Sequence, residues 1–154
     1  MGTGHNNSEI LLWDITTQKV SAVLEDEKMK NISKIDFSEN GYHMISCSKE
    51  MNVVNLWDLR KQDIIKSIEI PQLECDQGIH NVEFDFVGKY IAISSGRNPY
   101  VFNTKSSELI NLNSVNNNNN NDLSCNYVKF DRDMEYILSV SENGIMNVDL
   151  ICNN

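Results

Sequence analysis

The sequence has no long apolar run and few basic residues. No stretch approaches the roughly 18 consecutive apolar residues of a membrane-spanning helix, and the first residues, MGTGHNNSE, lack the basic start and apolar segment of a signal peptide. Lys and Arg number 13 against 22 Asp and Glu, which gives a formal charge of −9. A surface of this sign repels phosphate backbones. We therefore expect an intracellular protein that binds neither a membrane nor nucleic acid directly.

Residue patterns of catalysis and metal binding are also missing. There is no nucleophile motif, no phosphate-binding loop and no HExxH, and the one Gly-x-Gly, at residues 2–4, has no helix behind it. The cysteines form no CxxC pair and have no zinc spacing, so we expect reduced thiols. The scattered residues of these two types are Cys47, Cys75, Cys125 and Cys152, and His5, His43 and His80. We predict no catalytic, cofactor-binding or metal-binding residue, and no cofactor.

What the sequence does contain is an internal repeat. The segments ISKIDFSENGYHMISCS, HNVEFDFVGKYIAISSG and NYVKFDRDMEYILSVSE share a frame, and their phenylalanines, Phe37, Phe84 and Phe130, lie 47 and 46 residues apart. A second marker keeps a similar period. It consists of Trp13, Trp57, Phe102 and Val148, at spacings of 44, 45 and 46 residues. Two markers that agree on one period indicate a repeat architecture.

Each period contains short apolar runs rich in Val, Ile, Phe and Tyr, separated by turn-forming residues, which is typical of β-strands. The period that starts at Ile32 gives four such runs, ISKIDFS, YHMISCS, VVNLWDL and DIIKSIEI. Four short strands in about 45 residues form one blade of a β-propeller. An antiparallel β-sandwich is the alternative fold, but it does not require a fixed period with aligned aromatic residues.

The phrase Leu-Trp-Asp occurs twice, at residues 12–14 and 56–58. Successive side chains of a strand point to opposite faces of the sheet, so Leu56 and Trp57 both need cover. A propeller provides it, because each blade packs between two neighbours. We therefore interpret the phrase as structural, with Asp14 and Asp58 hydrogen-bonded in the turns that follow their strands.

These residues resemble WD40 repeats, whose structural motif corresponds to Trp13, Asp14, Trp57 and Asp58. FSENGY at residues 37–42, followed by LWDLRK at 56–61, is similar to the last blades of the pre-mRNA-processing factor 19 family. The resemblance implies an all-β fold, a partial WD40 β-propeller of about three to four blades out of seven, with residues 1–154 forming its C-terminal part.

The resemblance also implies a division of the chain. Residues 1–31 end one blade, 32–70 and 79–112 form two blades, and 125–150 form a final incomplete blade. Residues 113–124 contain an Asn run, Asn116 to Asn121, which we interpret as a solvated loop insertion without a function of its own.

Members of that family are nuclear splicing factors with a U-box that acts as an E3 ubiquitin ligase and a coiled coil that makes them homo-oligomers. Both elements are absent from these residues, so we expect this chain not to be an enzyme. It is expected to recruit proteins of a splicing and ubiquitin-ligase assembly. The alternatives are a WD40 adaptor of another complex, such as a substrate receptor or a chromatin or trafficking scaffold, and an enzyme built on a propeller.

WD40 blades commonly carry a Gly-His pair before the first strand and an Asp in the turn before the Trp strand, which form a hydrogen-bonded network with a Ser or Thr and the Trp. Residues 25–30 and 49–52 differ from this pattern, so we expect an incomplete network. Loops carry function on rigid scaffolds, and from position alone we expect the partner face in three of them. The residues are Lys28, Lys30, Lys49, Glu50, Arg97 and Asn98.

Overall fold

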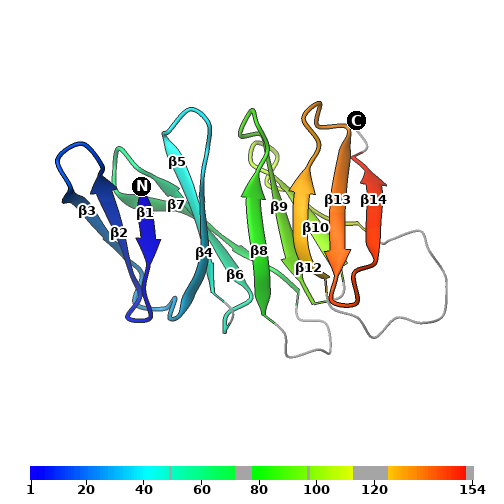
Figure 1. The fold of residues 1–154 in the computed structure, drawn as a ribbon, viewed down its shortest axis with the longest axis horizontal. Coiled ribbons are helices and arrows are strands. Elements are labelled where there is room, and N and C mark those ends of the chain that lie inside the picture. Colours follow the sequence, from blue (N-terminus) through cyan, green and yellow to red (C-terminus); the bar gives the residue numbers. More distant parts are fainter. Residues whose placement is uncertain (49, 72–77, 97, 113–124, 152–154) are drawn as a thin grey trace.

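The computed structural model describes residues 1–48, 50–71, 78–96, 98–112 and 125–151. These residues form fourteen strands and no helix, arranged as four antiparallel sheets that follow one another along an arc (Figure 1). The first sheet comprises β1 (Gly2–Gly4), β2 (Glu9–Asp14) and β3 (Lys19–Glu25). Its first strand, residues 2–4, pairs with β2, so this sheet has three strands.

The next two sheets have four strands each and the last has three, always in sequence order. The second comprises β4 (Ile32–Phe37), β5 (His43–Ser48), β6 (Val53–Asp58) and β7 (Asp63–Glu69). The third comprises β8 (Ile79–Phe84), β9 (Tyr90–Ser95), β10 (Asn98–Asn103) and β11 (Leu109–Asn111). The fourth comprises β12 (Cys125–Phe130), β13 (Tyr136–Ser141) and β14 (Met146–Leu150).

The four runs of the period that starts at Ile32 coincide with β4 to β7, within one residue at each end. The repeated phenylalanines, Phe37, Phe84 and Phe130, end the first strands of three successive sheets. These first strands contact one another along the inner side of the arc (Figure 1). The sequence period is therefore the period of the sheets.

The core lies between neighbouring sheets, not within one of them. Leu56 belongs to the cluster shared by the second and third sheets, and Trp57 belongs to the cluster shared by the first and second. The two side chains are 7% and 2% exposed. The interpretation of Leu56 and Trp57 as core residues on opposite faces is confirmed.

Trp57 also makes a buried polar contact. Its Nε1 donates a hydrogen bond to Oγ of Ser46 at 2.9 Å, and Nε1 of Trp13 donates in the same way to Oγ1 of Thr3. The buried Sδ of Met29 lies 3.5 Å from Oγ of Ser46, and a thioether is a weak acceptor. The hydrogen bond from Trp to a hydroxyl, one part of the expected network, is thus present. In the second sheet the sulfur of Met29 lies beside it.

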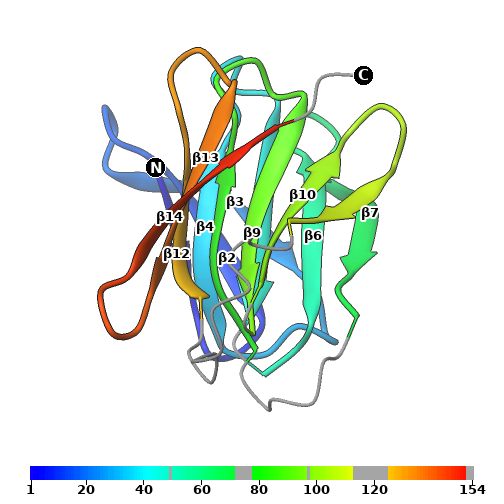
Figure 2. The same cartoon turned by 90° about the vertical axis from the view of Figure 1, so that its right-hand side faces the viewer.

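The two ends of the arc are less well covered than its middle. Leu12 and Trp13 of β2 are only half-buried, unlike their equivalents in β6, because one face of the first sheet is covered by another described sheet and the other is not. At the other end, β14 is the outermost strand of the fourth sheet (Figure 2), and one of its faces exposes a row of apolar side chains. Their exposed fractions are 61% for Met146, 62% for Val148 and 59% for Leu150.

Candidate functional site

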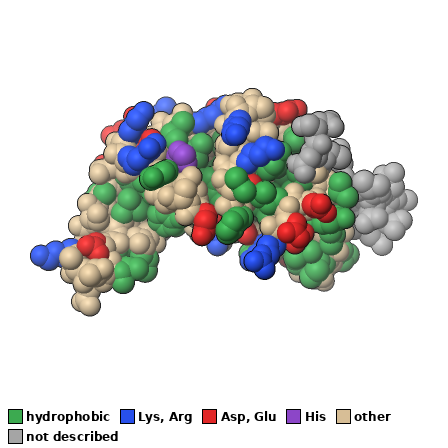
Figure 3. Space-filling model, turned by 90° about the horizontal axis from the view of Figure 1, so that it is seen from above, with side chains coloured by type: hydrophobic (Ala, Val, Ile, Leu, Met, Phe, Trp, Pro, Cys, Tyr) green, Lys and Arg blue, Asp and Glu red, His purple; other side chains and the backbone are tan. Residues whose placement is uncertain are grey.

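The turns between strands gather on two rims of the arc. The upper rim, at the top of Figure 1, includes the turns at residues 38–42, 59–62 and 85–89. The lower rim includes the loops at residues 26–31 and 50–52. Seen from above, basic and apolar side chains are interspersed along the upper rim (Figure 3). Aromatic residues and arginine are the types that protein interfaces favour on such a surface.

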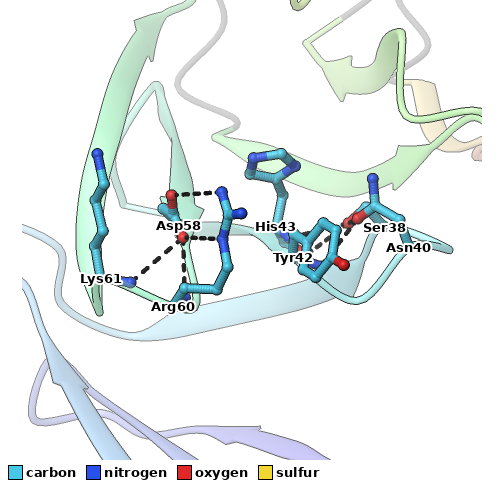
Figure 4. Close-up of polar contacts among 7 residues, drawn as sticks. All are labelled: Ser38, Asn40, Tyr42, His43, Asp58, Arg60 and Lys61. Carbon is cyan, nitrogen blue, oxygen red and sulfur yellow. Dashed lines mark hydrogen bonds and ion pairs between the residues drawn. The ribbon is translucent and has the colours of Figure 1, made fainter.

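Asp58 organises the turn after β6. Its Oδ1 accepts hydrogen bonds from the backbone N–H groups of Arg60, at 2.9 Å, and Lys61, at 3.3 Å (Figure 4). The equivalent turns of the neighbouring sheets are capped in the same way. Asp14 accepts from the N–H groups of residues 16 and 17, and Asn103 accepts from those of residues 105 and 106. The cap therefore belongs to the repeat.

Within the described part of the chain, the second sheet adds an ion pair and an aromatic contact to this cap. The guanidinium of Arg60 donates from Nε and Nη2 to the two carboxylate oxygens of Asp58, each at 3.2 Å. The same group lies over the ring of Tyr42, 4.7 Å from its centroid, within the range of a cation–π contact. The Arg60 side chain is 61% exposed, whereas that of Asp58 is 8% exposed. A buried carboxylate thus holds an exposed guanidinium against an aromatic ring.

The charges of this pair stabilise each other. The hydrogen bond from Arg60 is the largest cause that lowers the pKa of Asp58 from 3.8 to about 2. The same hydrogen bond is the largest cause that raises the pKa of Arg60. Both groups are therefore ionised at neutral pH. Among the residues that the structure describes, this is the single ion pair.

The turn that carries Tyr42 is built by its own side chains. Oδ1 of Asn40 accepts from the backbone N–H of Tyr42 at 2.9 Å, and Oγ of Ser38 accepts from that of His43 at 3.0 Å (Figure 4). The N–H of Leu59 then donates to the carbonyl of Tyr42 at 2.9 Å. The two turns are thus tied together, which fixes the ring of Tyr42 beneath Arg60.

The equivalent backbone hydrogen bond occurs in the third and fourth sheets, so the residues of these turns can be compared position by position. The N–H of Thr104 donates to the carbonyl of Lys89, and that of Ile151 donates to the carbonyl of Glu135. The residues equivalent to Tyr42 are therefore Lys89 and Glu135, neither of them aromatic. Sequence reasoning used Tyr42 and Arg60 only as part of a family resemblance. Comparing turn residues across the repeat would have singled them out.

The described residues of the predicted partner face lie on the lower rim. Lys28, Lys30 and Glu50 are exposed there, and Nδ2 of Asn31 donates to Oε1 of Glu50, which joins the two loops. Lys49 and Arg97 lie outside the described residues, as does the side chain of Asn98. The Asn run lies outside them as well.

A groove of about 230 Å³ opens beside these two loops, between Met29 and Met51. At its wall the buried Asn55 donates from Nδ2 to Oδ2 of Asp26 at 2.6 Å and accepts from Oγ of Ser67 at 2.8 Å. Both the nitrogen and the oxygen of the amide thus have partners within the fold. The polar wall of this groove is therefore explained by hydrogen bonds within the fold.

A larger open groove, of about 390 Å³, follows the inner strands β4, β8 and β12. It contains Lys34, Glu83 and Lys129, one on each strand. Partial burial raises the pKa of Glu83, and Lys129 opposes that shift. Oδ2 of Asp36 accepts from the N–H of Phe84 at 2.8 Å. Positively charged side chains on β4 and β12 thus line the groove together with a carboxylate on β8.

No reactive cluster is found in the described part of the chain. No three residues among its His, Cys, Asp and Glu are placed to hold a metal ion. Burial raises the pKa of both Cys47 and Cys125 to about 11, so these two thiols are protonated at neutral pH. The described residues include no helix with the length and apolar character that a membrane span requires.

Comparison with known proteins agrees with the repeat and the sheets. The sequence matches no protein-family model. It is 34% identical over 93 residues to "Pre-mRNA-processing factor 19" of Oryza sativa subsp. japonica, and 36% identical over 95 residues to "Pre-mRNA-processing factor 19 homolog 2" of Arabidopsis thaliana. These alignments cover 60% and 62% of this chain but 17% and 16% of those proteins. The predicted resemblance is confirmed as a sequence similarity.

Two further proteins widen the comparison. "Retinoblastoma-binding-like protein E" of Dictyostelium discoideum is 30% identical over 105 residues, which cover 68% of this chain and 19% of that protein. The solved β-propeller domain of Cps50 (Swd1) from Myceliophteria thermophila superposes with a TM-score of 0.83 at 17% identity, over 97% of this chain and 47% of that one. The predicted all-β, partial propeller fold is confirmed. The chain spans about half the length of that solved structure and less than a fifth of the curated relatives.

Proposed function

We propose that this part of a WD40 β-propeller is a protein-interaction scaffold in a pre-mRNA splicing assembly. The observation that carries the proposal is its similarity to two proteins named pre-mRNA-processing factor 19. That similarity accompanies a rigid arc whose two rims present turns. A scaffold of this kind works by holding loops at fixed positions, so that partners bind without reordering it.

Three features follow from the same proposal. The partners are proteins of a splicing and ubiquitin-ligase assembly, the location is the nucleus, and the chain acts as part of a longer, homo-oligomeric protein. The ligase chemistry would belong to a U-box elsewhere in that protein.

The test is to purify the tagged chain from cells and identify its partners by mass spectrometry. We expect splicing proteins to be enriched over a tag-only control, and to be lost with Trp57→Ala, which disrupts the core between the first two sheets. Enrichment of another complex without splicing proteins would contradict the proposal.

The second candidate is a WD40 adaptor of a different assembly. It is favoured by the 30% identity to a protein named for retinoblastoma binding, over a larger share of this chain than either plant protein covers. The same purification separates the two candidates, because it identifies the partners without assuming them.

A further inference from the structure

We propose that Arg60, held on the ring of Tyr42, is the centre of a docking surface for an acidic segment of a partner protein. The surface consists of Tyr42, Arg60 and Lys61 together with Phe86 and Val87 of the adjacent turn. The inference deepens the proposed scaffold function, and rests on it, by assigning one partner class to one rim.

The fold does not need the Arg60 side chain to close its turn. In all three equivalent turns an Asp or Asn accepts the same two backbone N–H groups, and the residue at the position of Arg60 is Thr16 in the first sheet and Lys105 in the third. Those turns close without a guanidinium. The ion pair and the aromatic contact of Arg60 are therefore additions to a turn that is already complete.

Arg60 is preorganised for binding, and its guanidinium still has free N–H donors. A guanidinium has five N–H donors in a planar fork. Asp58 occupies Nε and one N–H of Nη2, and within the described ranges no other acceptor lies in hydrogen-bonding range of this group. The remaining donors lie on a side chain that is 61% exposed. Since the side chain is already ordered, binding costs less rotamer entropy.

The neighbouring turn adds exposed apolar side chains to this surface. A side-chain carbon placed on Gly88 would lie 3.8 Å from Cβ of Ser38, so the turn at residues 85–89 is packed against the turn at 38–42. This neighbouring turn exposes Phe86 by 67% and Val87 by 62%. Arginine and aromatic residues dominate binding energy at protein interfaces. Phe86 and Val87 thus stand on the turn next to the one that carries Tyr42.

The occupant follows from the chemistry of these groups. The free donors of Arg60 match the two oxygens of a carboxylate, and exposed Lys61 adds a second positive charge. Phe86 and Val87 require an apolar side chain next to that carboxylate. The matching partner is a short peptide segment with Asp or Glu beside a leucine or phenylalanine.

The test uses the whole chain immobilised at low density, which keeps copies apart, and a synthetic peptide of alternating Glu and Leu, with binding measured by biolayer interferometry. We expect Arg60→Ala to weaken binding by at least about tenfold, as loss of a charge-assisted bidentate contact does. Arg60→Lys should weaken it as well, because a lysine lacks the planar fork. Phe86→Ser should also weaken it.

Lys105→Ala is the matched control, because it removes an exposed cation from the equivalent turn of the third sheet. It should change binding less than twofold. Equal losses for Lys105→Ala and Arg60→Ala would overturn the proposal, as would tighter binding of a single-stranded RNA oligonucleotide than of the peptide. Circular dichroism of each variant shows that its strands are intact. A peptide with Gln in place of Glu should not bind.

Failure of this inference can be told from failure of the scaffold function. If the wild-type chain captures splicing proteins from cells and Arg60→Ala captures the same set, the docking surface is wrong and the scaffold function remains. If Arg60→Ala loses a subset of partners, and Lys105→Ala keeps them, both are supported. If the wild type captures no splicing protein, the proposed function itself fails.

Discussion

Trp57 and Trp13 have the same chemistry and the same place in their repeats, but different surroundings. Trp57 is buried between two sheets, whereas Trp13 is half-buried at the end of the arc. Each donates its indole N–H to a hydroxyl. Their difference in burial therefore separates the contribution of packing from that of the hydrogen bond.

We expect Trp57→Ala to lower the free energy of unfolding by roughly 3 to 5 kcal/mol, as removal of a large buried aromatic does. Trp13→Ala, the matched control, should cost less, because part of its surface is already in water. Urea unfolding followed by circular dichroism measures both. Equal costs would show that the hydrogen bond, and not burial, dominates.

Asp58 gives a prediction on pH. Its pKa is lowered from 3.8 to about 2, mainly by the hydrogen bond from Arg60. A folded pKa below the unfolded one means that the ionised group stabilises the fold above about pH 4, and that this contribution is lost as the pH falls toward 2. The stability difference between the wild type and Asp58→Asn should therefore shrink over that range.

The carboxyl resonance of Asp58 can be followed directly by nuclear magnetic resonance. It should titrate near pH 2 in the wild type and at a higher pH in Arg60→Ala, because the main cause of the lowered pKa is removed. In Lys105→Ala the resonance should titrate as in the wild type. An unchanged pKa in Arg60→Ala would mean that the backbone N–H groups alone set it.

At the scale of the element, the turn after the first strand recurs three times. In each copy the backbone N–H of the fourth residue donates to the carbonyl of the first, from Gly41 to Ser38, from Gly88 to Asp85 and from Met134 to Asp131. All three donors have positive φ, at 70°, 74° and 57°. A residue with a β-carbon is strained in this conformation. The fourth sheet thus places methionine where the other two have glycine.

We expect Met134→Gly to raise stability slightly, by up to about 1 kcal/mol, because relief of strain exceeds the entropy that glycine adds to the unfolded chain. Gly88→Ala should have the opposite effect, by about 1 kcal/mol, in the equivalent turn. Thermal unfolding of the two variants measures both. A loss of stability in Met134→Gly would show that its side chain packs usefully.

The strands were predictable from sequence because their apolar runs repeat, and the cover of Leu56 and Trp57 followed from their being adjacent in a strand. The first strand of the first sheet, β1 at residues 2–4, carries little strand signal of its own, because two of its three residues are glycines. The contact of Arg60 with Tyr42 was not predictable either. It depends on how two turns are tied, and their residues are 18 positions apart.

At the scale of the whole molecule, apolar surface remains at both ends of the arc. Met146, Val148 and Leu150 are exposed on β14, and Val20 and Val23 on β3. β14 and β1 are also edge strands in their sheets, and open edges promote association. The arc is therefore expected to self-associate or to be only marginally stable when it is studied alone.

The prediction is checked by sedimentation velocity over a range of concentrations. The apparent mass should rise with concentration, and rise further with salt, because screening weakens the repulsion due to the charge of −9. Val148→Lys should reduce association, whereas Lys105→Ala on the upper rim should not. A monodisperse monomer with a cooperative thermal transition would contradict it.

The placement of the core between sheets has a consequence for how the molecule opens. Each sheet packs only against its neighbours in the arc. The third sheet is covered on both sides, and its strand β9 is buried along its full length. The end sheets share only one such cluster each. Amide hydrogens should therefore exchange with solvent fastest in β1 to β3 and β14 and slowest in β9, and the arc should lose its structure from the two ends inward.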